Sequence, residues 1–191
     1  MSMEIKEKSY LRLFCDICKV INSSLNLAEV LKRVTENVTN ALNVKGCAIF
    51  LWDKQRNILE IRATHGLSES YLKKGPIDAD KSIAETLKGK SVLISDIQKD
   101  ARIQYPDEAE KEGVASILSV PISVKDKIIG VLRIYTSEPR IFSEDESEFI
   151  SGLADMGGIA IENARMYAHL RADHEKLITD VHQWFDFGAV E

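Results

Sequence analysis

The sequence has few cysteines, no long apolar run and no signal peptide, and each shortage excludes a class of protein. Its 191 residues contain only Cys15, Cys18 and Cys47, which suits a reducing compartment where thiols stay free. No stretch approaches the ~20 apolar residues that cross a bilayer. The first ten residues are charged and lack an apolar segment. These features predict a cytoplasmic protein without a membrane partner.

Positive charge is also scarce in any one place. The formal net charge is -5, and no cluster of lysine and arginine is dense enough to follow a phosphate backbone, so nucleic acid is not expected as a partner. Hydrophobic residues make up 45% and charged residues 29% of the chain, which is typical of a globular domain.

Recognisable catalytic motifs are missing as well. The chain has no nucleophile elbow, no glycine-rich phosphate loop and no HExxH pair. His169, His174 and His182 are spaced by five and eight residues, not the four that place two metal ligands on one helix face. Cys15 and Cys18 lie inside a predicted helix, and Cys47 opens a predicted buried strand, so all three are expected to be small core residues. The sequence therefore predicts neither an enzyme nor a metal site.

Apolar periodicity predicts two helices at the start of the chain. Leu11, Phe14, Cys18 and Ile21 are spaced by 3, 4 and 3 residues, as on one face of a coiled-coil helix. Asn26 with Glu29 resembles a capping box that begins a second helix. The expected buried face of this second helix consists of Leu27, Val30, Leu31, Val34, Val38 and Leu42.

From Gly46 the pattern changes to that of an antiparallel sheet. Residues 47–52 are apolar on both faces, and residues 58–64 alternate, with Leu59, Ile61 and Ala63 on one face. A strand is expected at 91–97 and a second hairpin at 115–124 and 127–136. Pro121 predicts an edge or a bulge, and Gly130 a bulge. The connecting segments predict a loop with one helical turn at 65–80, a short helix at 81–90 ended by Gly89, and a loop with a short helix at 98–113 ended by Gly113.

The last predicted helix is too long for a compact domain. It begins with a capping box of Ser143 and Glu146, and it runs to about Phe185, which is ~60 Å. Gly188 supplies a stop. An apolar stripe continues along it and must be covered from outside the domain: Phe149, Leu153, Met156, Ala160, Ala164, Tyr167, Leu170, His174, Leu177, Val181 and Trp184.

This order of elements resembles a GAF domain, the small-molecule sensing module of signalling proteins. The resemblance rests on SIAETLKGKSVLISDIQKDARI (82–103), SILSVPISVKDKIIGVLRIY (116–135) and FSEDESEFISGLADMGGIAIENARMY (142–167). It implies an α+β, GAF-like or PAS-like fold. A central antiparallel sheet of about 5–6 strands would carry the N- and C-terminal helices on one face and a ligand pocket on the other. The expected organisation is a dimerisation helix (1–25), the GAF domain (26–167) and an extension of the exit helix (168–191).

The resemblance implies a sensory or regulatory function with a homodimer, a small-molecule ligand and a separate effector protein that a stand-alone domain addresses in trans. The dimer interface is expected to comprise Leu11, Phe14, Cys18, Ile21, Tyr167, Leu170, Leu177, Val181, Trp184 and Phe185. The alternative is a dimerisation or interaction module whose pocket is filled by side chains.

The family's known cofactors fit this sequence poorly. Cyclic-nucleotide GAF domains carry an Asn-Lys pair and then Asp-Glu three residues after a Phe, whereas Glu146-Ser147 follow Phe142 here. Bilin attachment uses a cysteine in the pocket crossover, and residues 65–115 contain none. A haem would need His65, the one histidine placed to line the pocket. GAF-like methionine sulfoxide reductases use cysteines on pocket loops, which this chain does not match.

Candidate ligand-binding residues follow from the resemblance and from strand alternation. Ser82, Ile83 and Ala84 would begin a helix whose free N–H groups hold an anion, while Asp96 and Arg102 would orient a polar ligand. The alternative for Ser82 and Asp96 is helix or turn capping, and for Arg102 it is solvation. The complete expected pocket set is His65, Ser82, Ile83, Ala84, Ile94, Asp96, Arg102, Ser116 and Leu118.

Overall fold

A computed structural model describes residues 3–23, 26–81 and 83–188, with side chains described for 10–21, 26–81 and 83–179. The elements in chain order are α1 (Met3–Ser23), α2 (Leu27–Leu42), β1 (Gly46–Asp53), β2 (Ile58–His65), α3 (Glu69–Leu72), β3 (Ile77–Asp78), η1 (Thr86–Lys88), β4 (Val92–Ile94), α4 (Pro106–Lys111), β5 (Ser116–Val124), β6 (Lys127–Thr136) and α5 (Glu144–Gly188).

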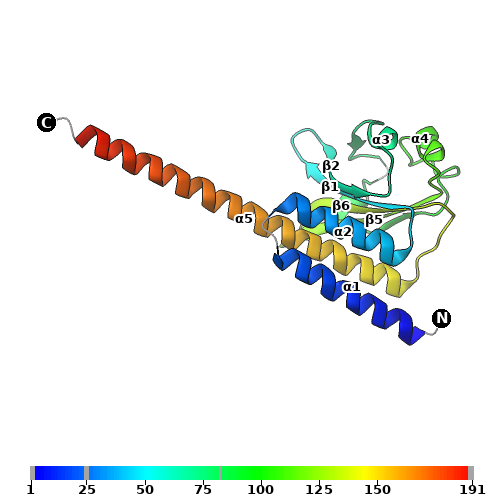
Figure 1. Cartoon of the computed structure of the whole chain (residues 1–191). Helices are drawn as coiled ribbons and strands as arrows, with labels where there is room; N and C mark the ends of the chain where they lie inside the picture. Colours follow the sequence, from blue (N-terminus) through cyan, green and yellow to red (C-terminus); the bar gives the residue numbers. More distant parts are fainter. Residues whose placement is uncertain (1–2, 24–25, 82, 189–191) are drawn as a thin grey trace.

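Six antiparallel strands form one sheet in the order β3-β2-β1-β6-β5-β4. Helices α1, α2 and the first half of α5 cover one face, which we call the helix face (Figure 1). The short elements α3, η1 and α4 lie over the opposite side, which we call the pocket face, and β3 is the edge strand beside β2. The predicted α+β, GAF-like arrangement is therefore confirmed.

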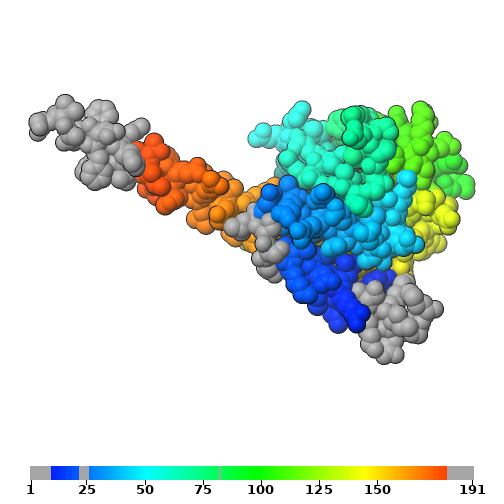
Figure 2. All heavy atoms as spheres, in the orientation of Figure 1, coloured from blue at the N-terminus to red at the C-terminus, as the bar shows by residue number. Residues whose placement is uncertain are grey.

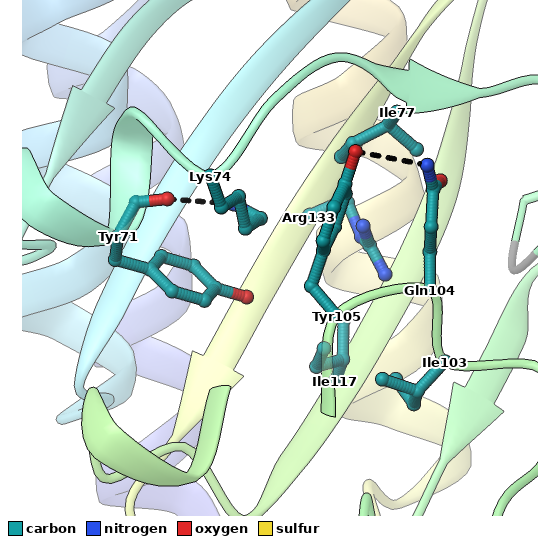
Figure 3. Close-up of a pocket in the computed structure, with 8 residues that line it drawn as sticks. All are labelled: Tyr71, Lys74, Ile77, Ile103, Gln104, Tyr105, Ile117 and Arg133. Atoms are coloured by element: carbon teal, nitrogen blue, oxygen red, sulfur yellow. Dashed lines mark hydrogen bonds between the residues drawn. The ribbon is translucent and has the colours of Figure 1, made fainter. Parts of the chain in front are cut away.

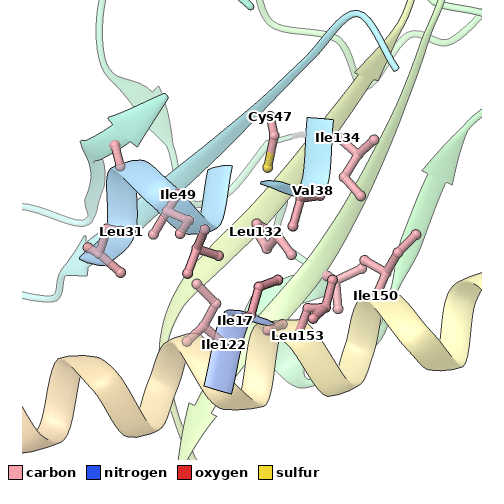
Figure 4. Packing of buried hydrophobic residues seen from close by; sticks show 14 of the residues in the cluster. Ile17, Leu31, Val38, Cys47, Ile49, Ile122, Leu132, Ile134, Ile150 and Leu153 are labelled. Atoms are coloured by element: carbon pink, nitrogen blue, oxygen red, sulfur yellow. The ribbon is translucent and has the colours of Figure 1, made fainter. Parts of the chain in front are cut away.

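Each face of the sheet has its own hydrophobic cluster, because β1 is apolar on both sides. Cys47, Ile49 and Leu51 join the cluster under the helices (Figure 4), whereas Ala48 and Phe50 join the cluster on the pocket face. The prediction that residues 47–52 form a strand covered on both faces is confirmed. The sheet thus separates two cores within one domain.

Two irregularities in the ladder set which side chains face which core. A register shift in the β1–β2 pair places Ile49 opposite Ala63 but Phe50 opposite Ile61. Leu59 consequently lies in the pocket-face cluster and Ala63 in the helix-face cluster, so the prediction that they share a face is wrong. The extra residue between the paired positions reverses the alternation.

The second irregularity is the bulge predicted at Gly130, and it is confirmed. Gly130 lies opposite Ile122, and the register shifts at the next pair. A Cβ at Gly130 would lie 2.2 Å from the Phe50 carbonyl oxygen, so only glycine allows β1 and β6 to approach this closely. Pro121 lies beyond the end of β4, which pairs only with residues 117–119 of β5. It needs no ladder donor there.

Capping chemistry explains the helix boundaries. The Asn26 side chain accepts from the backbone N–H groups of Ala28 and Glu29, and Ser143 and Glu146 form a reciprocal capping box at 3.1 and 3.2 Å. Both predicted starts are confirmed. The expected helix at 81–90 is wrong: its helical part is only the 3₁₀ turn η1, which ends at Gly89 in the left-handed conformation. The strand β3 was not predicted, since two residues carry no periodicity.

Helix α1 packs differently from its predicted stripe. Its buried side chain is Ile17, which is fully enclosed against α2 and α5 together with the partly buried Tyr10, Leu13 and Val20. Leu11 is 65% exposed and Phe14 is also exposed. The predicted apolar face of α1 is therefore adjacent to the face that packs on the core, and Leu11 and Phe14 point away from the core.

Helix α5 extends far beyond the domain. It has 45 residues, about 67 Å at ~1.5 Å per residue. Its second half projects as an arm from the globular body (Figure 1), and the part of this arm drawn in colour leaves the body in the same way in the space-filling view (Figure 2). The predicted overhang is confirmed. Among the described helices, none combines the length and hydropathy of a membrane span.

Candidate ligand pocket on the sheet

The pocket face is roofed by the irregular middle of the chain, which polar contacts hold in place. The Tyr105 hydroxyl donates to the Pro76 carbonyl oxygen at 2.9 Å, and Gln104 bonds the same oxygen at 3.3 Å. Gln104 also accepts from the Asp78 N–H at 2.9 Å. These bonds join the segment before α4 to the segment around β3 and close the roof over the sheet.

A small cavity remains between this roof and the sheet. Its volume is about 20 Å³. Its walls come from α3 and the loop after it, from β3, from the segment that precedes α4, and from β5 and β6 (Figure 3). The lining residues are Tyr71, Lys74, Ile77, Ile103, Gln104, Tyr105, Ile117 and Arg133. Three isoleucines supply apolar walls, and the other side chains carry polar groups.

Two of the lining groups are cations. Arg133 is 4% exposed, and its Nε has no hydrogen-bond partner. The Lys74 ammonium lies 3.1 Å from the Tyr71 carbonyl oxygen and 3.5 Å from the Tyr71 ring centroid. Burial, assisted by the charge of Arg133, lowers the pKa of Lys74 to about 8.

Further polar groups on the pocket face also lack partners within the part of the chain that the structure describes. They are Trp52 Nε1, Thr86 Oγ1, Ser119 Oγ and the Tyr135 hydroxyl. Ser119 is the direct ladder partner of Arg133, and the Arg133 guanidinium carbon lies 5.7 Å from the Tyr135 ring centroid. Since buried polar groups are normally hydrogen-bonded, this concentration under one roof is unusual.

The predicted pocket residues are only partly brought together. Ile83 and Ile94 belong to the pocket-face cluster, and Ala84 is half-buried beside them. Ser82 lies outside the described residues. No α-helix begins at 83–84, where turns precede η1, so the predicted helix N-terminus for an anion is wrong.

Three other predicted residues lie on the opposite face of the sheet. Leu118 belongs to the helix-face cluster. Ser116 is two residues before Leu118 on β5 and therefore lies on the same face, where its hydroxyl is 2.5 Å from that of Thr136. His65 is the ladder partner of Cys47, which is also in the helix-face cluster. The residue of this strand that reaches the cavity is Ile117.

Asp96 and Arg102 have local partners instead of a shared site. Asp96 accepts from the Gln98 N–H at 3.0 Å and pairs with Lys99 at 2.8 Å. Arg102 is exposed and pairs with Asp100 at 2.5 Å. Turn capping and local pairing, the alternatives that the sequence left open, describe both residues.

The cavity cations Arg133 and Lys74 were not anticipated. Arg133 stands alone as a charge within the apolar run VLRIY of β6, and this isolation was the available signal. Lys74 has no comparable signal, because KKG in a loop is typical of solvent-facing residues. Only the folded roof brings Lys74 next to the sheet.

The predicted dimer residues are mostly exposed in the single chain. Leu11, Phe14, Tyr167, Leu170 and Leu177 are exposed, and Cys18 and Ile21 are half-buried. Val181, Trp184 and Phe185 lie within the α5 backbone, but their side chains are outside the described residues.

An antiparallel sheet with helices on one face and a roofed pocket on the other defines the class of sensory and regulatory α+β domains. A sequence model of the GAF domain matches residues 26–161. The chain belongs to the GAF domain family.

Relatives and solved structures agree with this assignment. The chain is 21% identical over 182 residues to the formate hydrogenlyase transcriptional activator of Salmonella typhimurium, covering 92% of this chain and 26% of the relative. It is 29% identical over 140 residues to the methyl sulfide methyltransferase-associated sensor of Methanosarcina acetivorans, covering 70% and 14%. The chain thus spans about a quarter or less of these relatives.

The fold is similar to that of a GAF domain from a phosphoenolpyruvate-protein phosphotransferase of Coxiella burnetii. The TM-score is 0.75 at 22% identity, covering 85% of this chain and 98% of that one. A free methionine-R-sulfoxide reductase from Neisseria meningitidis is also similar, with a TM-score of 0.70 at 17% identity over 83% and 91%. The shared property is the fold.

Proposed function

We propose that this GAF domain binds a small molecule on its pocket face and passes its state to an effector through a parallel dimer of α5 helices. The observation that carries the proposal is the exposed apolar stripe along α5. Ile159 is 56%, Met166 50%, Leu170 69% and Leu177 62% exposed. Four large apolar side chains on one chain would gain substantially from a partner surface, since full burial of each contributes ~1.5–3 kcal/mol.

The four residues lie on one side of the helix. Their spacings are 7, 4 and 7 residues, which keep them within about 40° of one another at 3.6 residues per turn. The stripe begins at Ile159, where the other side of α5 still packs on its own domain through Ala160 and Ile161. A partner can therefore contact the domain and the arm together.

A second copy of the chain is the occupant that fits this surface. A twofold dimer places identical stripes against each other, and a seam spaced by 7 and 4 residues is that of a coiled coil. Ile159 and Met166 also border a groove of about 460 Å³ beside the β5–β6 turn, at the base of the arm. The seam would run from this groove along the arm.

Regulatory use is favoured over catalysis by the family and by the location of the thiols. Cys15 lies in α1 and Cys47 is buried in β1 under the helices, so neither faces the pocket. The activator and sensor among the relatives are named for regulatory roles. On this proposal the chain acts in the cytoplasm on a separate effector protein.

A second candidate is an interaction module with a filled pocket. The observation in its favour is the small size of the cavity, about 20 Å³, below the size of usual ligand pockets. Native mass spectrometry of the purified chain distinguishes the two. A bound small molecule supports the sensory function, and a ligand-free chain that ignores a broad metabolite panel supports the module.

Cysteine cross-linking tests the parallel dimer. In a chain with Cys15→Ser and Cys18→Ser, Leu170→Cys should form a disulfide between copies under mild oxidation. The matched control is Ala172→Cys, about 160° around the helix, which should stay monomeric on a denaturing gel. Equal cross-linking at both positions would contradict the seam.

A further inference from the structure

The buried guanidinium of Arg133 has no counter-charge. It is 4% exposed, and it forms no ion pair with any acidic residue that the structure describes. Arginine is almost never this buried unless it is paired, because a buried unpaired charge is costly. Tyr135, whose ring centroid lies 5.7 Å from the guanidinium carbon, offers a cation–π contact and, being neutral, supplies no counter-charge.

Lys74 brings a second positive charge to the same cavity. Both residues line it (Figure 3), and burial together with the charge of Arg133 lowers the pKa of Lys74, while Glu112 and Glu108 act in the opposite direction. Glu112 itself pairs with Lys45 at 3.8 Å and bonds the Ser68 N–H at 3.0 Å. Among the described residues, no carboxylate forms an ion pair with Lys74 or Arg133.

Neutral donors and apolar walls complete a receptor. Across the described part of the chain, Ser119 Oγ next to Arg133 has no hydrogen-bond partner, and Tyr71 brings a phenol to the lining of the cavity. In Figure 3 Tyr71 and Lys74 lie on one side, and Tyr105, Gln104 and Arg133 lie together on the other. Ile77, Ile103 and Ile117 close the remaining walls.

From this arrangement we infer that the cavity binds a small monocarboxylate, held by Arg133 and Lys74. The inference rests on the proposed sensory function and names its ligand class. The planar guanidinium fork matches a carboxylate. A volume of about 20 Å³, which would hold roughly one or two water molecules, leaves room only for a small head group. The isoleucine walls suit a short alkyl remainder.

The experiment compares acetate with its neutral isostere, acetamide, on the full chain at pH 7. Sodium acetate should raise the midpoint of thermal unfolding saturably, by several degrees, and show binding by calorimetry. Acetamide should have no effect, and sodium chloride at matched ionic strength should have none beyond the ionic-strength baseline. Equal responses to acetate and chloride would overturn the inference.

Variants locate the site. Arg133→Gln should abolish the acetate response, whereas Arg62→Gln, an exposed arginine paired with Glu60, should keep it. Lys74→Met should weaken acetate at least tenfold, and the neighbouring exposed Lys73→Met should not. If Arg133→Gln fails to fold, the Lys74→Met and Lys73→Met pair decides alone. An acetate response that survives Lys74→Met overturns the inference.

The two proposals fail in different ways. A neutral molecule found in the purified chain, with no response to acetate, would overturn the carboxylate assignment and leave the sensory function standing. A chain that binds acetate through Arg133 but shows no Leu170→Cys cross-link would support the site and contradict the dimeric signalling route.

Discussion

Arg133 and Tyr135 lie two residues apart on β6 and share the pocket face, with the guanidinium carbon 5.7 Å from the ring centroid. Burial raises the pKa of the Tyr135 hydroxyl, and the charge of Arg133 opposes that rise. Within the residues described, neither Arg133 Nε nor the Tyr135 hydroxyl has a partner of good hydrogen-bond geometry. Because buried polar groups without partners cost stability, we expect this pair to destabilise the empty domain.

Removing the unpaired charge should stabilise the empty domain. Arg133→Met is expected to raise the free energy of unfolding by ~1–3 kcal/mol in buffer without carboxylates, because replacing buried charge with an apolar side chain is often favourable. Urea unfolding followed by circular dichroism measures it. A loss of stability greater than 2 kcal/mol would mean that Arg133 is a structural residue.

Lys74 should make stability depend on alkaline pH. Its folded pKa of about 8 lies below the ordinary lysine value of 10.5, so between these values the unfolded chain binds the extra proton and the contribution of Lys74 to stability rises with pH. Cys47, whose pKa burial raises, acts in the opposite direction in every variant. From pH 8 to 9.5 the free energy of unfolding of the wild type and of Lys73→Met should therefore increase relative to that of Lys74→Met, and parallel pH profiles for all three would contradict the assignment.

A buried ion pair joins the helix layer at one end of the domain. Arg140 bonds Glu146 at 2.9 Å and the Leu42 carbonyl oxygen at 3.1 Å, which links α2 to α5. Arg140→Met should cost about 1.5–3 kcal/mol, because it removes the charge-assisted bonds from Arg140 to the Glu146 carboxylate and the Leu42 carbonyl oxygen. The exposed pair of Arg171 and Glu175 supplies the control: Arg171→Met should change stability by less than ~0.5 kcal/mol. Equal losses of stability in Arg140→Met and Arg171→Met would contradict the claim that the Arg140–Glu146 pair stabilises the domain more than the exposed pair does.

Glycine is required at the bulge but not in the helix. Gly130→Ala should destabilise by at least ~2 kcal/mol, since its Cβ would lie 2.2 Å from the Phe50 carbonyl oxygen. Gly157→Ala in α5 meets no atom within 4 Å and should stabilise by about 0.5–1 kcal/mol through helix propensity. Thermal unfolding of the two variants should therefore shift in opposite directions.

The thiols should differ sharply in reactivity. Cys15 is exposed, whereas Cys47 is buried and desolvation raises its pKa far above the usual range. A thiol reagent at pH 8 should modify Cys15 within minutes and leave Cys47 intact until the domain unfolds. Mass spectrometry of the digested protein assigns the sites, and rapid labelling of Cys47 would show that the sheet opens.

Strong local patterns made much of the fold predictable. The capping box of Ser143 and Glu146 and the long apolar periodicity fixed the start and length of α5. The turn at Lys125 and Asp126, both in left-handed conformations, fixed the second hairpin. Caps, helical periodicity and tight turns are determined by residues that are close together in the sequence, so they can be predicted from the sequence alone.

The pocket was less predictable because it depends on strand phase and on distant segments. Both Ile117 and Leu118 are apolar, so alternation alone does not say which one faces the roof, and the wrong phase assigned Ser116 and Leu118 to the pocket. The register shift opposite Ile49 and Phe50 likewise reverses the face of Ala63. Lys74 meets Arg133 only after the roof has folded over β6.

The most direct test of the central claim, a domain that transmits through paired α5 helices, is sedimentation equilibrium of the full chain at micromolar concentration. The account predicts a mass near twice the chain mass of 21.4 kDa, and a weaker association for a chain truncated after Tyr167. A full chain that sediments as a clean monomer under these conditions would contradict it.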